Sequence, residues 1–185
     1  MKAITLTQPW ASLVALGLKK IETRGWRTDH RGPLAIHAAK GFPKWASDLV
    51  RNDWEFFGAF HPERAASLKS AGVRLIPSAS GYQAAAELPL GAVVATCQLV
   101  ACWKTELFRL NGLVSQEEFD SLRNSGSPYR GGTRIVTAEM TDRERAFGDY
   151  SPGRWAWVLE DVKPLAVPVP AKGALSLWEW TPPNA

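Results

Sequence analysis

The sequence predicts an α+β fold, in which a mixed or antiparallel β-barrel is flanked by helices. Three observations predict it. Strand-like segments recur along the chain, helical stretches interrupt them, and the regular alternation of strand and helix that is typical of parallel α/β sheets is missing. A chain of 185 residues holds one hydrophobic core of ordinary size. We therefore expect a single domain over residues 1–185, with helical insertions at about 43–86 and 104–135.

The first forty residues contain a helix and, later, a strand. Pro9 favours the first helical turn, apolar residues then recur at roughly helical spacing, and Gly17 is a typical C-terminal stop. This pattern predicts a helix over about 9–17. A run of small and aliphatic residues over 34–39 follows Gly32-Pro33 and predicts a strand.

Between these two elements lies a segment whose charged side chains share one face. Residues 20–24 alternate with period two, so Lys20, Glu22 and Arg24 project to one side of a strand and Thr23 to the other. The segment therefore predicts a strand with an ionic face.

The rest of the chain predicts further strands and another helix. Residues 91–103 are β-branched and apolar on both faces, which is typical of a central strand. A capping-box pattern predicts a helix over about 115–123. Residues 154–160 alternate as a strand does, and an apolar segment over 174–180 closes the chain.

The composition is that of an ordinary globular protein. Apolar residues make up 45% and charged residues 22%, and no apolar run approaches the roughly 20 residues that span a bilayer. The N-terminus lacks the apolar core and cleavage site of a secretory signal, so we expect a cytoplasmic protein without a membrane partner. Cys97, Cys102 and three histidines lack the spacing of a zinc site. We expect free thiols, no metal and no cofactor, and the oligomeric state stays open.

Positive charge is concentrated near the N-terminus. Residues 1–40 hold seven Lys or Arg and two acids, a net charge of +5, whereas the remaining 15 bases and 16 acids give −1. Such a local excess can supply the electrostatic part of phosphate binding. A solvated basic surface without a ligand would show the same count.

Three motifs stand out in this N-terminal part: Gln8-Pro9-Trp10, a G-x-K-x-x-E-x-R pattern over 17–24, and an R-G-x-L-x-I-H-A pattern over 31–38. Together they resemble the ASCH (activating signal cointegrator homology) family, and residues 150–157 look like the closing strand of the same domain. The resemblance implies a PUA-like barrel with a helix beside a cleft, in a family linked to RNA, DNA and modified-nucleoside binding. The expected partner is therefore a nucleoside, a nucleotide or RNA.

One branch of the family consists of small bacterial amidohydrolases that remove the acyl group of N4-acetylcytidine with a lysine, a threonine and a glutamate. Two registers carry these residues over to this chain. Aligned on glycine and arginine, the lysine falls on Lys19 and the threonine on Glu22. Aligned on the spacing between lysine and threonine, the pair becomes Lys20 and Thr23, and the arginine is displaced by one position. The two registers put different side chains in the cleft, because neighbouring residues of a strand point to opposite faces.

The glutamate of these amidohydrolases lies in a helical segment before the final strand. The corresponding stretch here offers Glu139 and Glu144, without a motif to choose between them. A lysine whose pKa is lowered by burial would serve as a general base, and the hydroxyl of Thr23 would serve as a nucleophile. The same ionic cluster would equally suit a structural network that fixes the register of the barrel.

Aromatic and basic side chains near this cluster are candidates for ligand binding. Trp26 could stack on a base, and so could Trp10, although a tryptophan on the apolar side of a helix is typical of a core. The guanidinium of Arg154 suits bidentate phosphate recognition, with a salt bridge to Asp149 or Glu160 as an equal alternative. The ligand-binding candidates are Trp10, Arg24, Trp26, His37, Tyr150 and Arg154.

The sequence leaves two functions open and ranks a third behind them. The first is hydrolysis of the exocyclic amide of an N4-acylated cytosine nucleoside. The second is a non-catalytic module that binds RNA, DNA or a modified nucleotide with the same cleft. Ribonuclease activity, which has been proposed for some family members, ranks last because the three histidines do not form an acid–base pair.

Overall fold

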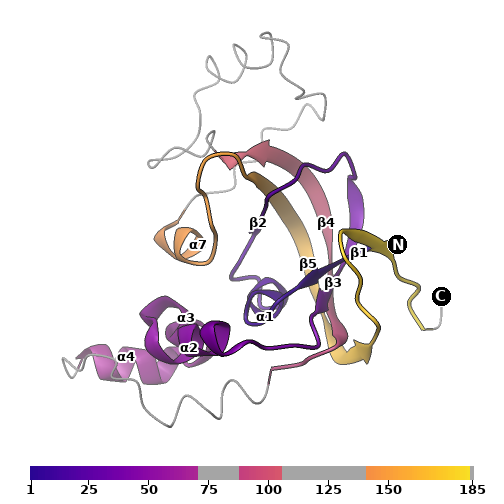
Figure 1. The fold of residues 1–185 in the computed structure, drawn as a ribbon. Coiled ribbons are helices and arrows are strands. Elements are labelled where there is room, and N and C mark those ends of the chain that lie inside the picture. The colour runs from indigo at the N-terminus through magenta and orange to yellow at the C-terminus, as the bar shows by residue number, and fades with distance from the viewer. Residues whose placement is uncertain (71–87, 106–140, 184–185) are drawn as a thin grey trace. The chain divides into compact units, whose positions relative to one another are not determined.

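The computed structural model describes residues 1–70, 88–105 and 141–183 (Figure 1). These residues form an α+β fold with a six-stranded mixed sheet, in the hydrogen-bonded order β2-β5-β4-β3-β1-β6. The predicted fold class, an α+β PUA-like fold with flanking helices, is thereby confirmed. The strands are β1 (Lys2–Leu6), β2 (Ile21–Arg24), β3 (Gly32–Ala38), β4 (Ala92–Lys104), β5 (Trp155–Pro170) and β6 (Leu177–Glu179).

The helices in the described part of the chain are short, and none of them is long and apolar enough to cross a membrane. The predicted N-terminal helix is present as α1, and the described part of the first insertion forms α2, α3 and α4. The predicted helix over 115–123 and nearly all of the second insertion lie outside the described residues. The helices are α1 (Trp10–Ala15), α2 (Lys44–Asn52), α3 (Trp54–Phe60), α4 (Pro62–Ser70) and α7 (Asp142–Ala146).

The chain divides into two compact units, which are described separately. The first unit consists of Met1–Lys19, Pro33–Cys97 and Asp161–Ala185. The second unit consists of Lys20–Gly32 and Gln98–Glu160. Strands β4 and β5 each contribute residues to both units.

In the first unit, β1 lies between two strands that are distant from it in sequence. It pairs in parallel with β3, with Thr5 opposite His37, and antiparallel with β6, with Ala3 opposite Trp178. The sequence analysis predicted no strand before the first helix, and β1 corrects this. The five residues of β1 carry a weak local signal, and pairing with distant strands decides their conformation.

In the second unit, β2 pairs antiparallel with β5. Ile21 lies opposite Val158 and Arg24 opposite Trp155, and the side chains of Ile21 and Trp157 are fully buried. Ile21 and Val158 share one face of this ladder. Glu22 and Arg24 share the other face, as the period-two pattern predicted, and there Trp157 and Trp155 lie opposite them. The ladder therefore fixes where the ionic side chains of β2 emerge.

Candidate functional site

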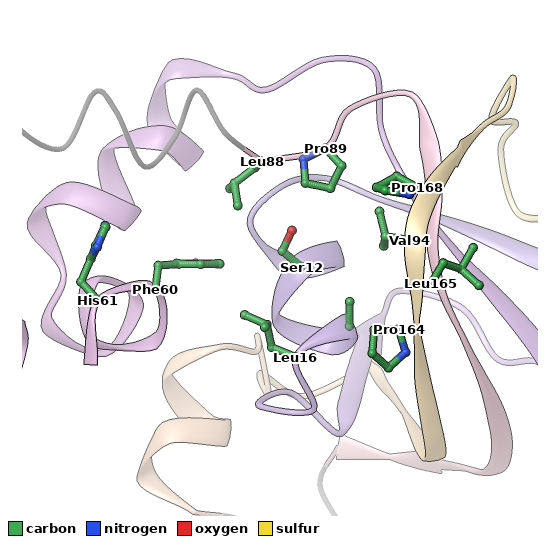
Figure 2. Close-up of a pocket in the computed structure, with 11 residues that line it drawn as sticks. Ser12, Leu16, Phe60, His61, Leu88, Pro89, Val94, Pro164, Leu165 and Pro168 are labelled. Carbon is green, nitrogen blue, oxygen red and sulfur yellow. The ribbon is translucent and has the colours of Figure 1, made fainter. Parts of the chain in front are cut away.

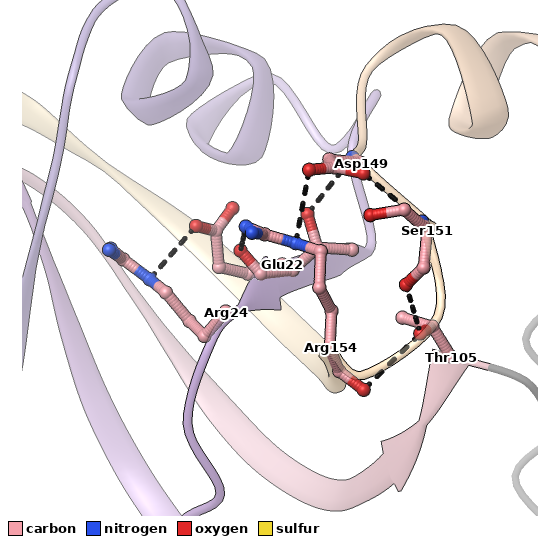
Figure 3. Close-up of polar contacts among 7 residues, drawn as sticks. Glu22, Arg24, Thr105, Asp149, Ser151 and Arg154 are labelled. Carbon is pink, nitrogen blue, oxygen red and sulfur yellow. Dashed lines mark hydrogen bonds and ion pairs between the residues drawn. The ribbon is translucent and has the colours of Figure 1, made fainter.

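The ionic face of β2 carries an ion pair between Glu22 and Arg24. The Nε atom of Arg24 lies 3.1 Å from Oε1 of Glu22 (Figure 3). The Glu22 side chain is 11% exposed and the Arg24 side chain 26% exposed. The Glu22 carboxylate is therefore largely buried, and it orients the Arg24 guanidinium, which is still partly exposed to solvent.

A second guanidinium group is fixed beside this pair by the turn before β5. The Nε atom of Arg154 lies 3.3 Å from Oδ2 of Asp149, and its Nη2 donates to the carbonyl oxygen of Thr23 at 3.3 Å (Figure 3). Asp149 is thus one of the two partners that the sequence suggested for Arg154. Hydrogen bonds from Ser151 lower the pKa of Asp149, and the nearby Arg154 lowers it further.

Thr105, at the end of β4, holds this turn in place. Its backbone N–H donates to the carbonyl oxygen of Arg154 at 3.0 Å, and its hydroxyl donates to the carbonyl oxygen of Ser151 at 2.8 Å (Figure 3). Thr105 is 2% exposed. The position of the Arg154 guanidinium therefore rests on a buried backbone anchor, which the sequence analysis did not identify.

Thr23 is engaged in the same scaffold. Its Oγ1 accepts the backbone N–H of Asp149 at 3.1 Å, and the residue is 8% exposed. The hydroxyl group suggested as a nucleophile thus links β2 to the turn that carries Arg154.

Glu144 lies in α7, where its carboxylate accepts hydrogen bonds from the start of β2 and from Tyr150. Oε2 accepts the backbone N–H of Lys20 at 2.8 Å, and Oε1 accepts the N–H of Ile21 at 3.2 Å and the hydroxyl of Tyr150 at 3.2 Å. The residue is 4% exposed, and its own N–H donates to the N-cap side chain of Thr141 at 3.0 Å. The carboxylate therefore secures the start of β2, and the other glutamate candidate, Glu139, lies outside the described residues.

Tyr150 is a buried partner of that carboxylate. Burial raises the pKa of its hydroxyl far above the usual value of 10, and the adjacent negative charges of Glu144 and Glu22 raise it further. The hydroxyl therefore stays protonated and donates to Glu144. This geometry fits a structural hydrogen bond better than the ligand contact suggested for Tyr150.

The two candidate lysines differ sharply in exposure. Lys19, the last residue of the first unit, is fully buried, whereas Lys20, the first residue of the second unit, is exposed. Burying an amine is costly unless it is paired or neutral. Of the two registers suggested by the amidohydrolases, one therefore uses a buried lysine and the other an exposed lysine.

Trp26 packs against the interior of the second unit. Its ring meets that of Trp157 edge to face, with centroids 4.7 Å apart and an interplanar angle of 89°. The Nε1–H of Trp157 donates to the carbonyl oxygen of Trp26 at 3.4 Å. Trp26 is partly buried, and this packing limits the surface that it offers to a base.

His37 lies within the first unit, covered by the segment between β5 and β6. It is 1% exposed, its Nε2 lies 3.0 Å from the carbonyl oxygen of Ala171, and its ring packs edge to face on Trp178. Nδ1 is buried and has no hydrogen-bond partner among the described residues. Burial lowers the pKa of His37, so the ring is neutral near pH 7 and donates through Nε2.

The first unit also contains a cavity of about 360 Å³ beside α1 (Figure 2). Its walls are mostly apolar, and Ser12 presents a hydroxyl group to it. Buried Gln8 holds this wall, because its Nε2 donates to Ser12 Oγ at 2.9 Å and to the carbonyl oxygen of Pro89 at 2.8 Å. The lining residues are Ser12, Ala15, Leu16, Phe60, His61, Leu88, Pro89, Val94, Pro164, Leu165 and Pro168.

The two cysteines of the chain carry free thiols. Cys97 and Cys102 are both buried, and burial raises the pKa of the Cys97 thiol to about 12. Within the described residues, no group of three or more His, Cys, Asp or Glu side chains is arranged to hold a metal ion.

Comparison with known proteins gives a family match. The model of the ASCH domain family matches residues 4–125, well over half of the chain. Curated relatives include Activating signal cointegrator 1 of Homo sapiens, 46% identical over 48 residues, and the protein of the same name from Mus musculus, 51% identical over 48 residues. The matched segment is 25% of this chain and 8% of each relative, so the chain covers a small part of their length.

Proposed function

The chain belongs to the ASCH domain family, and on this premise we propose that it binds a nucleotide or RNA through the guanidinium groups of Arg24 and Arg154. The observation that carries the proposal is that two arginines of the second unit are both oriented by carboxylates and both partly exposed. Their side chains are 26% and 31% exposed, respectively. Guanidinium groups held in this way suit the planar, bidentate recognition of a phosphate.

Both arginines belong to one end of the β2–β5 ladder. Arg24 lies opposite Trp155 in the β2–β5 ladder, and Arg154 directly precedes Trp155. A guanidinium has five N–H donors, so an ion pair through Nε is compatible with a ligand at another edge. We propose that a phosphate group is bound at this end of the ladder, where Arg24 belongs to the N-terminal segment that carries the excess of positive charge.

A second function, hydrolysis of the exocyclic amide of an N4-acylated cytosine nucleoside, is favoured by Lys19. Lys19 is fully buried and lies in the family's signature motif, and lysine is among the side chains that serve as general bases. We rank this function second because the Thr23 hydroxyl and the Glu144 carboxylate are both engaged in hydrogen bonds that hold β2. A binding protein needs the ionic face alone, whereas the enzyme needs a nucleophile and a proton carrier as well.

The test of the proposal is the affinity for a labelled single-stranded RNA, measured by fluorescence anisotropy. Replacing Arg24 or Arg154 with alanine should each weaken binding by about 10-fold or more, the usual effect of losing a charge-assisted contact. Lys163→Ala is the matched control, since Lys163 is an exposed cation of β5 outside the second unit. Equal affinities for the wild type and both arginine variants would overturn the proposal.

The enzyme function is tested in parallel with N4-acetylcytidine. Purified protein is incubated with this nucleoside at neutral pH, and loss of the acyl chromophore is followed for the wild type and for Lys19→Met and Lys20→Ala. Turnover that disappears in the Lys19 variant alone would establish hydrolysis and fix the register. RNA binding without turnover would leave the binding function alone.

A further inference from the structure

Trp45 is an unusually exposed tryptophan. It lies in the first turn of α2 and is 61% exposed, whereas Ala46, Ser47 and Val50 of the same helix are buried. The buried residues define the inward face of α2, and helical geometry places Trp45 on the opposite side. The largest apolar side chain of the helix is therefore turned toward solvent.

The ring of Trp45 nevertheless rests on a firm support. Its centroid lies 5.7 Å from that of Trp10 at an interplanar angle of 43°. The Trp10 ring meets the buried Phe56 ring edge to face, with centroids 5.8 Å apart. Trp45 is therefore connected to the core of the first unit through Trp10, and an aromatic ring positioned in this way loses little entropy when a ligand stacks on it.

Two exposed lysines lie close to Trp45 in the sequence. Lys40 is exposed, and the Lys44 side chain is 81% exposed. The acidic neighbour, Asp48, is shared by Lys44 at 2.6 Å and Arg51 at 3.5 Å, so two cations offset one carboxylate. Lys40, Lys44 and Trp45 are called the Trp45 surface below.

The composition of the Trp45 surface favours a nucleobase over a protein. Over the described residues 40–63, Trp45 is the large hydrophobic side chain that is exposed. The core of a protein interface requires a contiguous apolar patch, whereas one aromatic ring beside lysines matches a base and its phosphates. Single-stranded RNA presents unstacked bases of this kind.

We propose that Trp45 stacks on a base of single-stranded RNA while Lys40 and Lys44 contact the adjoining phosphates. This inference rests on the proposed function and adds a second contact to it, within the inserted helices of the first unit. It assigns to α2 a role in holding the RNA. The residues concerned lie outside the motifs that mark the family.

The experiment compares two RNAs of equal length, one of them lacking its bases, by fluorescence anisotropy. The wild type should prefer the RNA with bases, because the abasic chain offers phosphates alone. Trp45→Ala should weaken binding of the normal RNA about 5- to 150-fold and abolish most of the preference. Trp45→Phe should retain part of it, and Leu175→Ala, which removes another highly exposed apolar side chain, should change nothing.

Three other results distinguish a failure of base stacking by Trp45 from a failure of the proposed RNA binding. If the wild type binds neither RNA, the proposed function fails and the inference falls with it. If Arg154→Ala loses affinity while Trp45→Ala keeps both affinity and base preference, the inference is overturned and the proposed function stands. If Trp45→Ala changes only self-association, measured by light scattering, the Trp45 surface binds protein and the inference is wrong.

Discussion

Replacing Glu144 with glutamine converts one oxygen of a buried carboxylate into an NH2 group at the start of β2. The carboxylate accepts the N–H groups of Lys20 and Ile21 and the hydroxyl of Tyr150. A glutamine can keep its single oxygen toward two of these donors only by turning its NH2 group toward the third. One buried donor then faces another donor, and the charge that strengthens the remaining bonds is lost.

The size of the effect follows from these contacts. An unsatisfied buried donor costs about 1–3 kcal/mol, and the loss of charge assistance adds roughly 1 kcal/mol. We therefore expect Glu144→Gln to lower the free energy of unfolding by about 2–4 kcal/mol. Tyr150→Phe removes one of the three donors and leaves both backbone N–H groups satisfied, so it should cost about 1 kcal/mol.

Urea denaturation followed by circular dichroism measures both variants. The midpoint for Glu144→Gln should fall by about 1 M or more at an unchanged m-value. The reasoning would be refuted by a Glu144→Gln protein within about 0.5 kcal/mol of the wild type, or by a Tyr150→Phe protein that loses as much stability as Glu144→Gln. Either result would show that the Glu144 carboxylate does not stabilise the fold in this way, and a role as a proton carrier would again be open to it.

Three further predictions concern the first unit. Burial lowers the pKa of His37 below its usual 6.5, so the unfolded chain binds more protons in acid than the folded chain does. The free energy of unfolding should therefore decrease as the pH falls below about 6.5. His37→Gln should flatten this part of the plot of unfolding free energy against pH. Gly173→Ala would place a methyl group 2.6 Å from His37 Nδ1 and 2.8 Å from Thr5 Oγ1. Thermal unfolding should show that this variant loses about 1–3 kcal/mol of unfolding free energy. Gly41→Ala, where the methyl group meets no atom within 4 Å, should change the unfolding free energy little. Asp53 caps α3 by accepting two backbone N–H groups, so Asp53→Ala should cost about 1 kcal/mol in urea denaturation, and an unchanged midpoint would contradict this assignment.

The sequence predicted the elements whose patterns are local. The β-branched run at 91–103 became β4, and the period-two alternation after Lys19 became β2. Strand β1 was not predicted, because its five residues are ordered by pairing with strands that are far away in sequence. The strand predicted over 154–160 continues beyond its alternating pattern into a proline-rich segment, which forms the end of β5. Its prolines follow Val158, where the register with β2 ends, so their missing N–H groups interrupt no bond of that ladder.

The site was predictable in its composition and less so in its contacts. The pattern of β2 predicted that Glu22 and Arg24 would share a face, and they form an ion pair. The sequence could not reveal that Glu144 holds the start of β2, because that contact joins residues more than a hundred positions apart. A local signal for α7 did exist, since Thr141 and Glu144 have the spacing of a capping box.

The central claim is that Arg24 and Arg154 neutralise phosphates of a bound RNA. The most direct measurement is the salt dependence of binding, with log Kobs of single-stranded RNA plotted against log of the salt concentration. Each lost phosphate contact should reduce the slope by about 0.7. We expect this reduction for Arg24→Ala and for Arg154→Ala, and none for Lys163→Ala. Slopes that are identical in all four proteins would contradict it.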